Sequence, residues 1–185
     1  WVFPGGRIDP HEFEAAGEDA LRAAQLAAVR ETAEEANVTI PVDGLVYFSH
    51  WTTPVIRPKR FSTWFFLASV TDKAVQIDGG EIHDFEWQTP VNGLAAQAEG
   101  RIELPPPTFV TLTLLAPFTK VADALAHFRS VPALEIQPNV VKTESAFVYL
   151  YNGDAGRASQ NPDAEGPRHR LLQPKSGPWQ YIREP

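Results

Sequence analysis

The chain of 185 residues contains no cysteine, so disulfide bonds and thiolate chemistry are both excluded. No apolar run approaches the roughly 20 residues of a membrane helix, and no basic segment followed by an apolar one opens the chain. A positive charge balance is also lacking, because the formal net charge is -7, whereas a general nucleic-acid binder carries a basic surface. We therefore expect a soluble, cytoplasmic protein with no membrane partner and no general affinity for nucleic acid.

The composition is that of an ordinary globular protein. Hydrophobic residues make up 43% of the chain and charged residues 21%, which is typical of folded proteins and not of disordered ones. The length suffices for one domain with a substantial core.

Three glutamates close together are the most informative feature of the sequence. In a helix that advances about 100° per residue, Glu34 and Glu35 lie within roughly 60° of Glu31, so the three carboxylates form one cluster. Their repulsion costs stability unless a cation neutralises it. Hard oxygen ligands suit Mg²⁺ or Mn²⁺. The alternative at this point is a solvated charged face with no ligand.

The residues around the glutamates give this cluster a context. Pro4-Gly5-Gly6 and the segment Arg30–Val38 resemble the Nudix box, a glycine turn followed by a helix with the pattern R-E-x-x-E-E. This resemblance implies an α+β fold with a mixed sheet in an α/β/α sandwich, and a metal-dependent hydrolase that cleaves diphosphate linkages. It also implies a small-molecule nucleotide as the substrate and Mg²⁺ or Mn²⁺ as the cofactor.

The box departs from the usual pattern in two places. Glu12 has the expected distance from Gly6, but seventeen residues instead of seven separate it from Arg30, so the box is lengthened. Asn37 replaces the final glycine, and asparagine tolerates the left-handed conformation that closes a helix. Because of the insertion, the first box acid is either one of three glutamates or is absent. The three alternatives are Glu12, Glu14 and Glu18.

The resemblance also implies roles for individual residues. Metal ligation falls to Glu31, Glu34 and Glu35, with Glu31 serving either as a ligand or as the catalytic base. Arg30, four residues before Glu34, is predicted to pair with that carboxylate and to orient it for catalysis. The glycines of the turn, Gly5 and Gly6, let the backbone approach the substrate.

Candidates outside the box extend the predicted site. An additional carboxylate in many Nudix enzymes completes the metal site or acts as base, and Glu81 and Glu86 are the alternatives here. A basic cluster is suited to phosphate oxygens, although a solvated loop between strands explains it as well; its members are Arg57, Lys59 and Arg60.

A second resemblance concerns the substrate. His50–Pro54, Lys59–Ala68 and Pro105–Thr108 are similar to the corresponding segments of peroxisomal coenzyme A diphosphatases and their bacterial relatives. This similarity favours coenzyme A or an acyl derivative. ADP-ribose, a dinucleotide and a capped RNA end stay open as alternatives.

Hydrophobic periodicity and turn residues predict the remaining elements. We expect one Nudix domain over residues 1–185 that lacks a usual strand ahead of the box, with a β-rich C-terminal extension from about 132. The segment 168–170, Arg168, His169 and Arg170, is expected at a solvated strand edge, with an anionic ligand as the alternative. Helices are predicted at 18–36, 90–98, from 108 and at 119–129; strands at 1–3, 45–51, 62–70, 75–77, 85–89, 146–151, 170–173 and 179–182; loops at 8–17 and 152–167.

Two other interpretations remain open. The displaced first acid and the missing glycine favour a catalytically silent Nudix-fold module that binds nucleotides or regulates a partner. Alternatively, the glutamates are a charged surface on an unrelated α/β domain. The oligomeric state is also open, with a homodimer among the possibilities.

Overall fold

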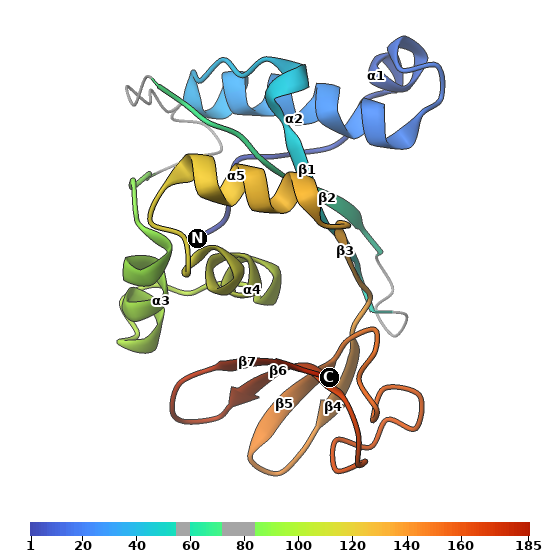
Figure 1. Ribbon diagram of the computed structural model, residues 1–185, viewed down its shortest axis with the longest axis vertical. Coiled ribbons are helices and arrows are strands. Elements are labelled where there is room, and N and C mark those ends of the chain that lie inside the picture. The colour runs from blue at the N-terminus through green and yellow to red at the C-terminus, as the bar shows by residue number, and fades with distance from the viewer. Residues whose placement is uncertain (55–59, 72–83) are drawn as a thin grey trace.

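The computed structural model describes residues 1–54, 60–71 and 84–185 (Figure 1). Its helices are α1 (Pro10–Ala15), α2 (Ala20–Ala36), α3 (Pro90–Ala98), α4 (Pro106–Leu115) and α5 (Val121–Ser130), with a 3-10 turn η1 (Val42–Gly44). Its strands are β1 (Val46–Thr52), β2 (Ser62–Leu67), β3 (Leu134–Ile136), β4 (Asn139–Lys142), β5 (Ala146–Leu150), β6 (Arg168–Pro174) and β7 (Gln180–Glu184).

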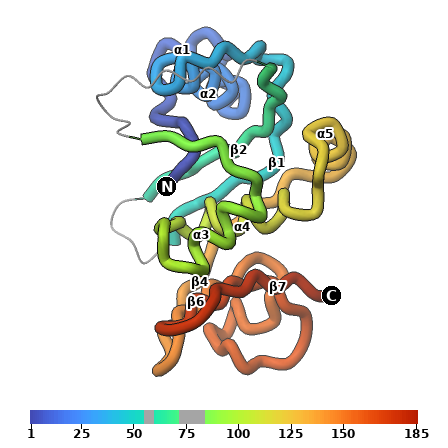
Figure 2. The backbone as a smooth tube through the Cα atoms, turned by 90° about the vertical axis from the view of Figure 1, so that its left-hand side faces the viewer, coloured from blue at the N-terminus to red at the C-terminus, as the bar shows by residue number. Residues whose placement is uncertain are grey.

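The strands form two separate sheets. The first is mixed, in the order β2-β1-β3: at His50, β1 pairs antiparallel with β2 opposite Trp64 and parallel with β3 opposite Glu135. The second sheet is antiparallel, in the order β4-β5-β6-β7. Helix α2 and the second sheet lie at opposite ends of the long axis, with α3, α4 and α5 between them (Figures 1 and 2). The predicted α+β fold with a mixed sheet and a β-rich C-terminal part is confirmed.

Helix α2 has well-defined ends that the sequence explains. Asp19 is the N-cap and accepts a hydrogen bond from the backbone N–H of Arg22 at 3.0 Å. Asn37 ends the helix with φ = 53°, the left-handed conformation that was predicted for it. The helix buries small residues, which lets its backbone lie close to its neighbours: Ala23, Ala24, Ala27 and Ala36.

The conformation of Asn37 leads to a stability prediction. The left-handed backbone conformation costs alanine about 1 kcal/mol or more in free energy, whereas it costs glycine almost nothing. We expect Asn37→Ala to lower the free energy of unfolding by about 1 kcal/mol and Asn37→Gly to leave it within about 0.5 kcal/mol of the parent. Urea unfolding followed by circular dichroism measures both. Equal stability of the two variants would contradict this account of the helix end.

The predicted loop 8–17 is wrong, because it contains the six-residue helix α1. Asp9-Pro10, which we interpreted as a turn, begins this helix: the proline sits in the first turn, and the backbone N–H of Asp9 donates to Glu12 Oε2 at 2.8 Å. Gly17 and Glu18 then take φ values of 62° and 67°, which reverse the chain into α2. The insertion in the box therefore folds as a helix that packs back on α2.

Other boundaries also differ from the sequence predictions. Residues 1–3 and 85–89 form no strand, and α4 begins at Pro106, two residues before the predicted cap Thr108. Strands β3 and β4 were not predicted, because each is too short to give a clear pattern. The predicted strand 75–77 lies outside the described residues. None of the described helices is long and apolar enough to cross a membrane.

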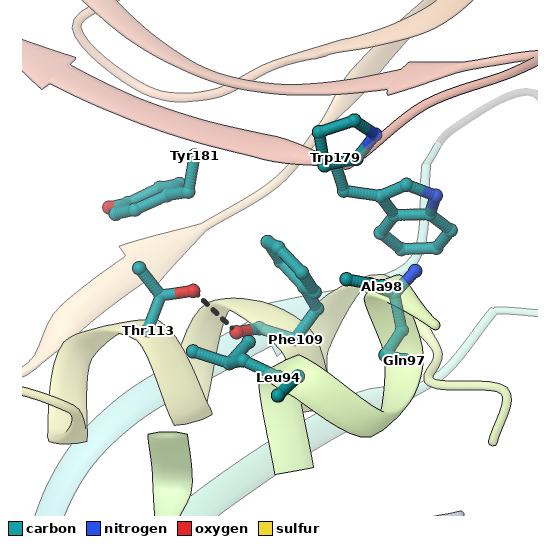
Figure 3. A pocket seen from close by; sticks show the side chains of 9 residues that line it. Leu94, Gln97, Ala98, Phe109, Thr113, Trp179 and Tyr181 are labelled. Atoms are coloured by element: carbon teal, nitrogen blue, oxygen red, sulfur yellow. Dashed lines mark hydrogen bonds between the residues drawn. The ribbon is translucent and has the colours of Figure 1, made fainter. Parts of the chain in front are cut away.

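One hydrophobic cluster connects the first sheet, α4 and the second sheet. Trp51 of β1 packs edge-on against the buried ring of Tyr151 at 5.6 Å, and Leu171 of β6 belongs to the same cluster. On the same face of the second sheet, Tyr181 pairs with Leu171, and Trp179 and Tyr181 face α3 and α4 across a cavity of about 380 Å³ (Figure 3). Because this core is shared, we propose that residues from about 132 onward extend one domain, 1–185.

Candidate active site

Arg30 of α2 lies at the centre of a group of carboxylates. Its Nε donates to Glu12 Oε1, and its Nη1 donates to Glu31 Oε1 and to Glu34 Oε2, each at 2.9 Å. The predicted pair between Arg30 and Glu34, one helical turn apart, is therefore present. The hydrogen bond to Glu12, followed by those to Glu31 and Glu34, raises the pKa of Arg30 above its ordinary value. Arg30 is charged at any working pH and holds three acids in place.

Glu12 is the one of the three alternative first acids that reaches the site. It is 3% exposed, whereas Glu14 and Glu18 are exposed to solvent. Burial alone would raise the pKa of the Glu12 carboxyl, but hydrogen bonds from Arg30 and from the backbone N–H of Asp9 lower it below its usual value. The spacing from Gly6 pointed to Glu12, and helix α1 is what carries it back to Arg30 across the insertion.

The glycine turn lies directly against the acids of α2. The backbone N–H of Gly5 donates to Glu35 Oε2 at 3.0 Å. A β-carbon added at Gly6 would lie 2.1 Å from Glu31 Oε1, so the carboxylate at the end of the Glu31 side chain would have to shift. Glycine at residue 6 therefore lets the loop lie against the Glu31 carboxylate in its observed position. The loop and the helix form one surface that carries both backbone and carboxylate groups.

The donor chemistry of this surface fits a hard divalent cation. Glu31, Glu34 and Glu35 offer carboxylate oxygens from neighbouring turns of one helix, and such oxygens suit Mg²⁺ or Mn²⁺. Among the described residues, there is no group of three His, Cys, Asp or Glu side chains that could hold a metal ion in the present arrangement. Arg30 takes one oxygen of Glu31 and one of Glu34, so a cation has to compete with this guanidinium for them.

Of the other predicted site residues, the structure describes Glu86 and Arg60, and neither contacts Arg30. Glu86 is exposed in the irregular segment before α3, and Arg60 is exposed just ahead of β2. Glu81, Arg57 and Lys59 lie outside the described residues. The roles of all five stay predictions.

Comparison with known proteins agrees with the geometry of the loop and helix. A family model described as the NUDIX domain matches residues 1–104, which is more than half of the chain. The chain belongs to the Nudix family. The resemblance of the glycine turn and the acidic helix to the Nudix box is thereby confirmed, and the interpretation as a charged surface on an unrelated α/β domain is wrong. The Nudix match ends just before α4, so the second sheet lies beyond it.

Three curated proteins illustrate which Nudix proteins the chain resembles. Acyl-coenzyme A diphosphatase NUDT19 of Xenopus laevis is 30% identical over 133 residues, which cover 68% of this chain and 35% of that protein. The human protein of the same name is 32% identical over 114 residues, which cover 58% of this chain and 30% of the human protein. Putative nudix hydrolase 7 of Caenorhabditis elegans is 27% identical over 191 residues, covering 83% and 62%. The chain thus spans less than two thirds of each relative, and no solved structure gave a significant match.

Proposed function

We propose that this Nudix chain is a Mg²⁺- or Mn²⁺-dependent hydrolase that cleaves the diphosphate linkage of a nucleoside diphosphate derivative. The observation that carries the proposal is the grouping of Glu12, Glu31 and Glu34 around Arg30, with the Gly5 and Gly6 backbone against the same helix. A surface with this density of acids repels a diphosphate unless a cation lies between them. Activity is therefore expected to depend strictly on metal.

The residues of the proposed site have different roles in the reaction. Glu34 and Glu35, with Glu31, would hold the metal, which when bound offsets negative charge on the diphosphate and acidifies water. As an alternative to ligation, we propose Glu31 as the base that takes the proton from the attacking water; its side chain is 13% exposed and is paired with Arg30. In that step the water oxygen forms a bond to phosphorus, and the bond from phosphorus to the bridging oxygen breaks. Arg30 orients Glu31 and Glu34 through the hydrogen bonds of its Nη1.

Coenzyme A or an acyl-coenzyme A is the proposed substrate. Two curated relatives carry the name acyl-coenzyme A diphosphatase, and the segments His50–Pro54 and Pro105–Thr108 favour the same class. The net charge of -7 is compatible with an anionic substrate only if the charge of the site is neutralised locally by metal.

A substrate panel tests this proposal. Coenzyme A, octanoyl-coenzyme A, ADP-ribose and a diadenosine polyphosphate are each incubated with the chain in Mg²⁺, in Mn²⁺ and in EDTA, and the nucleotide products are separated by chromatography. We expect cleavage of the coenzyme A compounds with either metal and none in EDTA. Cleavage of ADP-ribose alone would contradict coenzyme A as the substrate class but would support diphosphate hydrolysis as the reaction. If no compound is cleaved, the proposed hydrolysis itself is contradicted.

A catalytically silent nucleotide-binding module is the second candidate. It is favoured by one observation: Arg30 already satisfies oxygens of Glu31 and Glu34, and the described residues offer no preformed group of three donors. Calorimetry with a non-hydrolysable diphosphate analogue separates the two candidates when it is combined with the panel. Binding of the analogue together with no cleavage of any panel compound favours the silent module.

The close approach at Gly6 leads to a prediction about activity. In Gly6→Ala the new methyl group displaces the Glu31 carboxylate, and misplacement of a catalytic group by about 1 Å costs roughly 10²-fold in rate. We expect kcat/KM to fall by about that factor, with little change in thermal stability because residue 6 is exposed. Pro4→Ala in the same exposed loop is the control. Unchanged kcat/KM in Gly6→Ala would show that Glu31 needs no contact with the turn.

A further inference from the structure

A large cavity lies where the first sheet meets the second one. Its volume is about 720 Å³, within the range of small-molecule sites in proteins. Trp51 and Phe65 of the first sheet, Pro106 of α4, and Val140 and Phe147 of the second sheet all line it. The cavity is therefore built partly from the Nudix part of the chain and partly from the sheet beyond the family match.

The walls of this cavity are mainly apolar. Among the residues of its lining that the structure describes, Lys142 is the single charged one, with its Nζ 5.9 Å from the ring centre of Phe147. Two aromatic rings in the lining stay partly open to solvent, Phe61 at 52% and Phe147 at 38%. The described part of this lining suits a neutral ligand with a long apolar part.

Aromatic contacts connect the cavity to the acidic site. The ring of Phe65 lies 6.4 Å from the ring of Phe3, edge to face. Phe3 stands two residues before Gly5, and these two steps span at most about 7 Å. Gly5 in turn donates to Glu35. A ligand whose diphosphate lies at the glycine turn can therefore extend a flexible arm along Phe3 and Phe65 into the cavity.

We propose that this cavity binds the acyl-pantetheine arm of an acyl-coenzyme A, with the acyl chain against the aromatic and proline walls. This inference rests on the proposed function, because it assigns the two ends of that substrate to two parts of the structure. Lys142 is the donor for a carbonyl oxygen of the arm, since it is the charged side chain among the described residues of this mainly apolar lining. The smaller cavity in Figure 3 is a poorer candidate, because its lining comes from α3, α4 and residues 178–181 and includes no cation.

The test uses a probe that has the arm without the nucleotide. S-Octylpantetheine is neutral and carries no diphosphate, so its binding to the full chain, measured by calorimetry in EDTA, does not depend on metal or on hydrolysis. We expect binding to the parent, and binding about tenfold weaker for Phe147→Ala, which removes an aromatic wall. Phe85→Ala is the matched control, since Phe85 is 43% exposed and does not line the cavity; it is expected to bind like the parent.

Hydrolysis gives a second readout. If octanoyl-coenzyme A and ADP-ribose are both substrates, Phe147→Ala is expected to raise KM for octanoyl-coenzyme A about tenfold and to leave the kinetics with ADP-ribose unchanged. No binding of S-octylpantetheine to the parent, or equal binding by Phe147→Ala and Phe85→Ala, overturns the proposal. A third outcome is that S-octylpantetheine binds the parent and Phe85→Ala more tightly than Phe147→Ala, but no diphosphate is cleaved. This result supports the cavity assignment and contradicts the proposed reaction.

Discussion

Replacing Glu34 by glutamine is expected to lower kcat/KM for metal-dependent cleavage by about 10²- to 10⁴-fold. The metal stabilises the transition state by several kcal/mol, each 1.36 kcal/mol corresponds to a factor of ten in rate, and a neutral amide is a much weaker ligand. The fold should be unaffected, because the Glu34 side chain is 59% exposed and its pair with Arg30 contributes at most about 0.5 kcal/mol. Initial rates over a range of Mg²⁺ concentrations measure the change.

The control for this prediction is Glu14→Gln. Glu14 is an exposed acid on α1, close in sequence to Glu12 but on the solvent side of the helix. Its replacement removes the same charge and is expected to leave kcat/KM within about twofold of the parent. Parent-like kcat/KM in Glu34→Gln, or an equal loss in both variants, would remove Glu34 from the metal site.

The second large effect concerns the stability of the C-terminal sheet. Arg170 Nε and Nη2 donate to the two oxygens of Asp154 at 2.7 Å each, and the side chains are 7% and 0% exposed. We expect Arg170→Met to lower the free energy of unfolding by about 3–5 kcal/mol at pH 7, because it leaves a buried carboxylate without its cation. Urea unfolding at pH 7 measures the loss.

A double variant shows whether the unpaired charge causes this loss. Asp154→Asn combined with Arg170→Met removes both charges and keeps an oxygen that can accept the backbone N–H of His169. The double variant is therefore expected to be more stable than Arg170→Met alone. If the double variant is the less stable of the two, the loss comes from packing and not from charge.

The same ion pair predicts a dependence on pH. Burial alone would raise the pKa of the Asp154 carboxyl, but the hydrogen bonds from Arg170, His169 and Gly156 lower it below its ordinary value. A lowered pKa in the folded state adds stability above the unfolded pKa of about 3.9, and this stability is lost as the pH falls through the folded value. In Arg170→Met the carboxylate protonates more readily, so the gap in unfolding free energy between parent and variant should narrow as the pH falls from 7 toward 4.

Local rules predicted the acidic helix well. Helical spacing alone places Glu31, Glu34 and Glu35 together and pairs Arg30 with Glu34. The tolerance of asparagine for positive φ predicted the end of α2 at Asn37. These inferences succeed because each depends on residues within about one helical turn.

Long-range contacts account for what the sequence did not predict. The spacing from Gly6 made Glu12 one alternative among three, but only the fold of the insertion as α1 brings it to Arg30. Likewise, His169 and Arg170 were expected at a solvated edge, whereas both are buried, because Asp154, sixteen residues before Arg170 in the predicted exposed loop, provides the buried partner. No local pattern encodes such a pairing, so neither the ion pair nor the cavity between the two sheets followed from the sequence.

The most direct test of the central claim is phosphorus NMR of the parent chain with octanoyl-coenzyme A. We expect that the diphosphate signals are replaced by monophosphate signals in Mg²⁺, that EDTA stops this change, and that Glu35→Gln slows it by at least about tenfold. Diphosphate signals that persist in Mg²⁺, or that disappear equally fast in EDTA, would contradict the assignment of the Arg30 to Glu35 segment as a metal-dependent diphosphatase site.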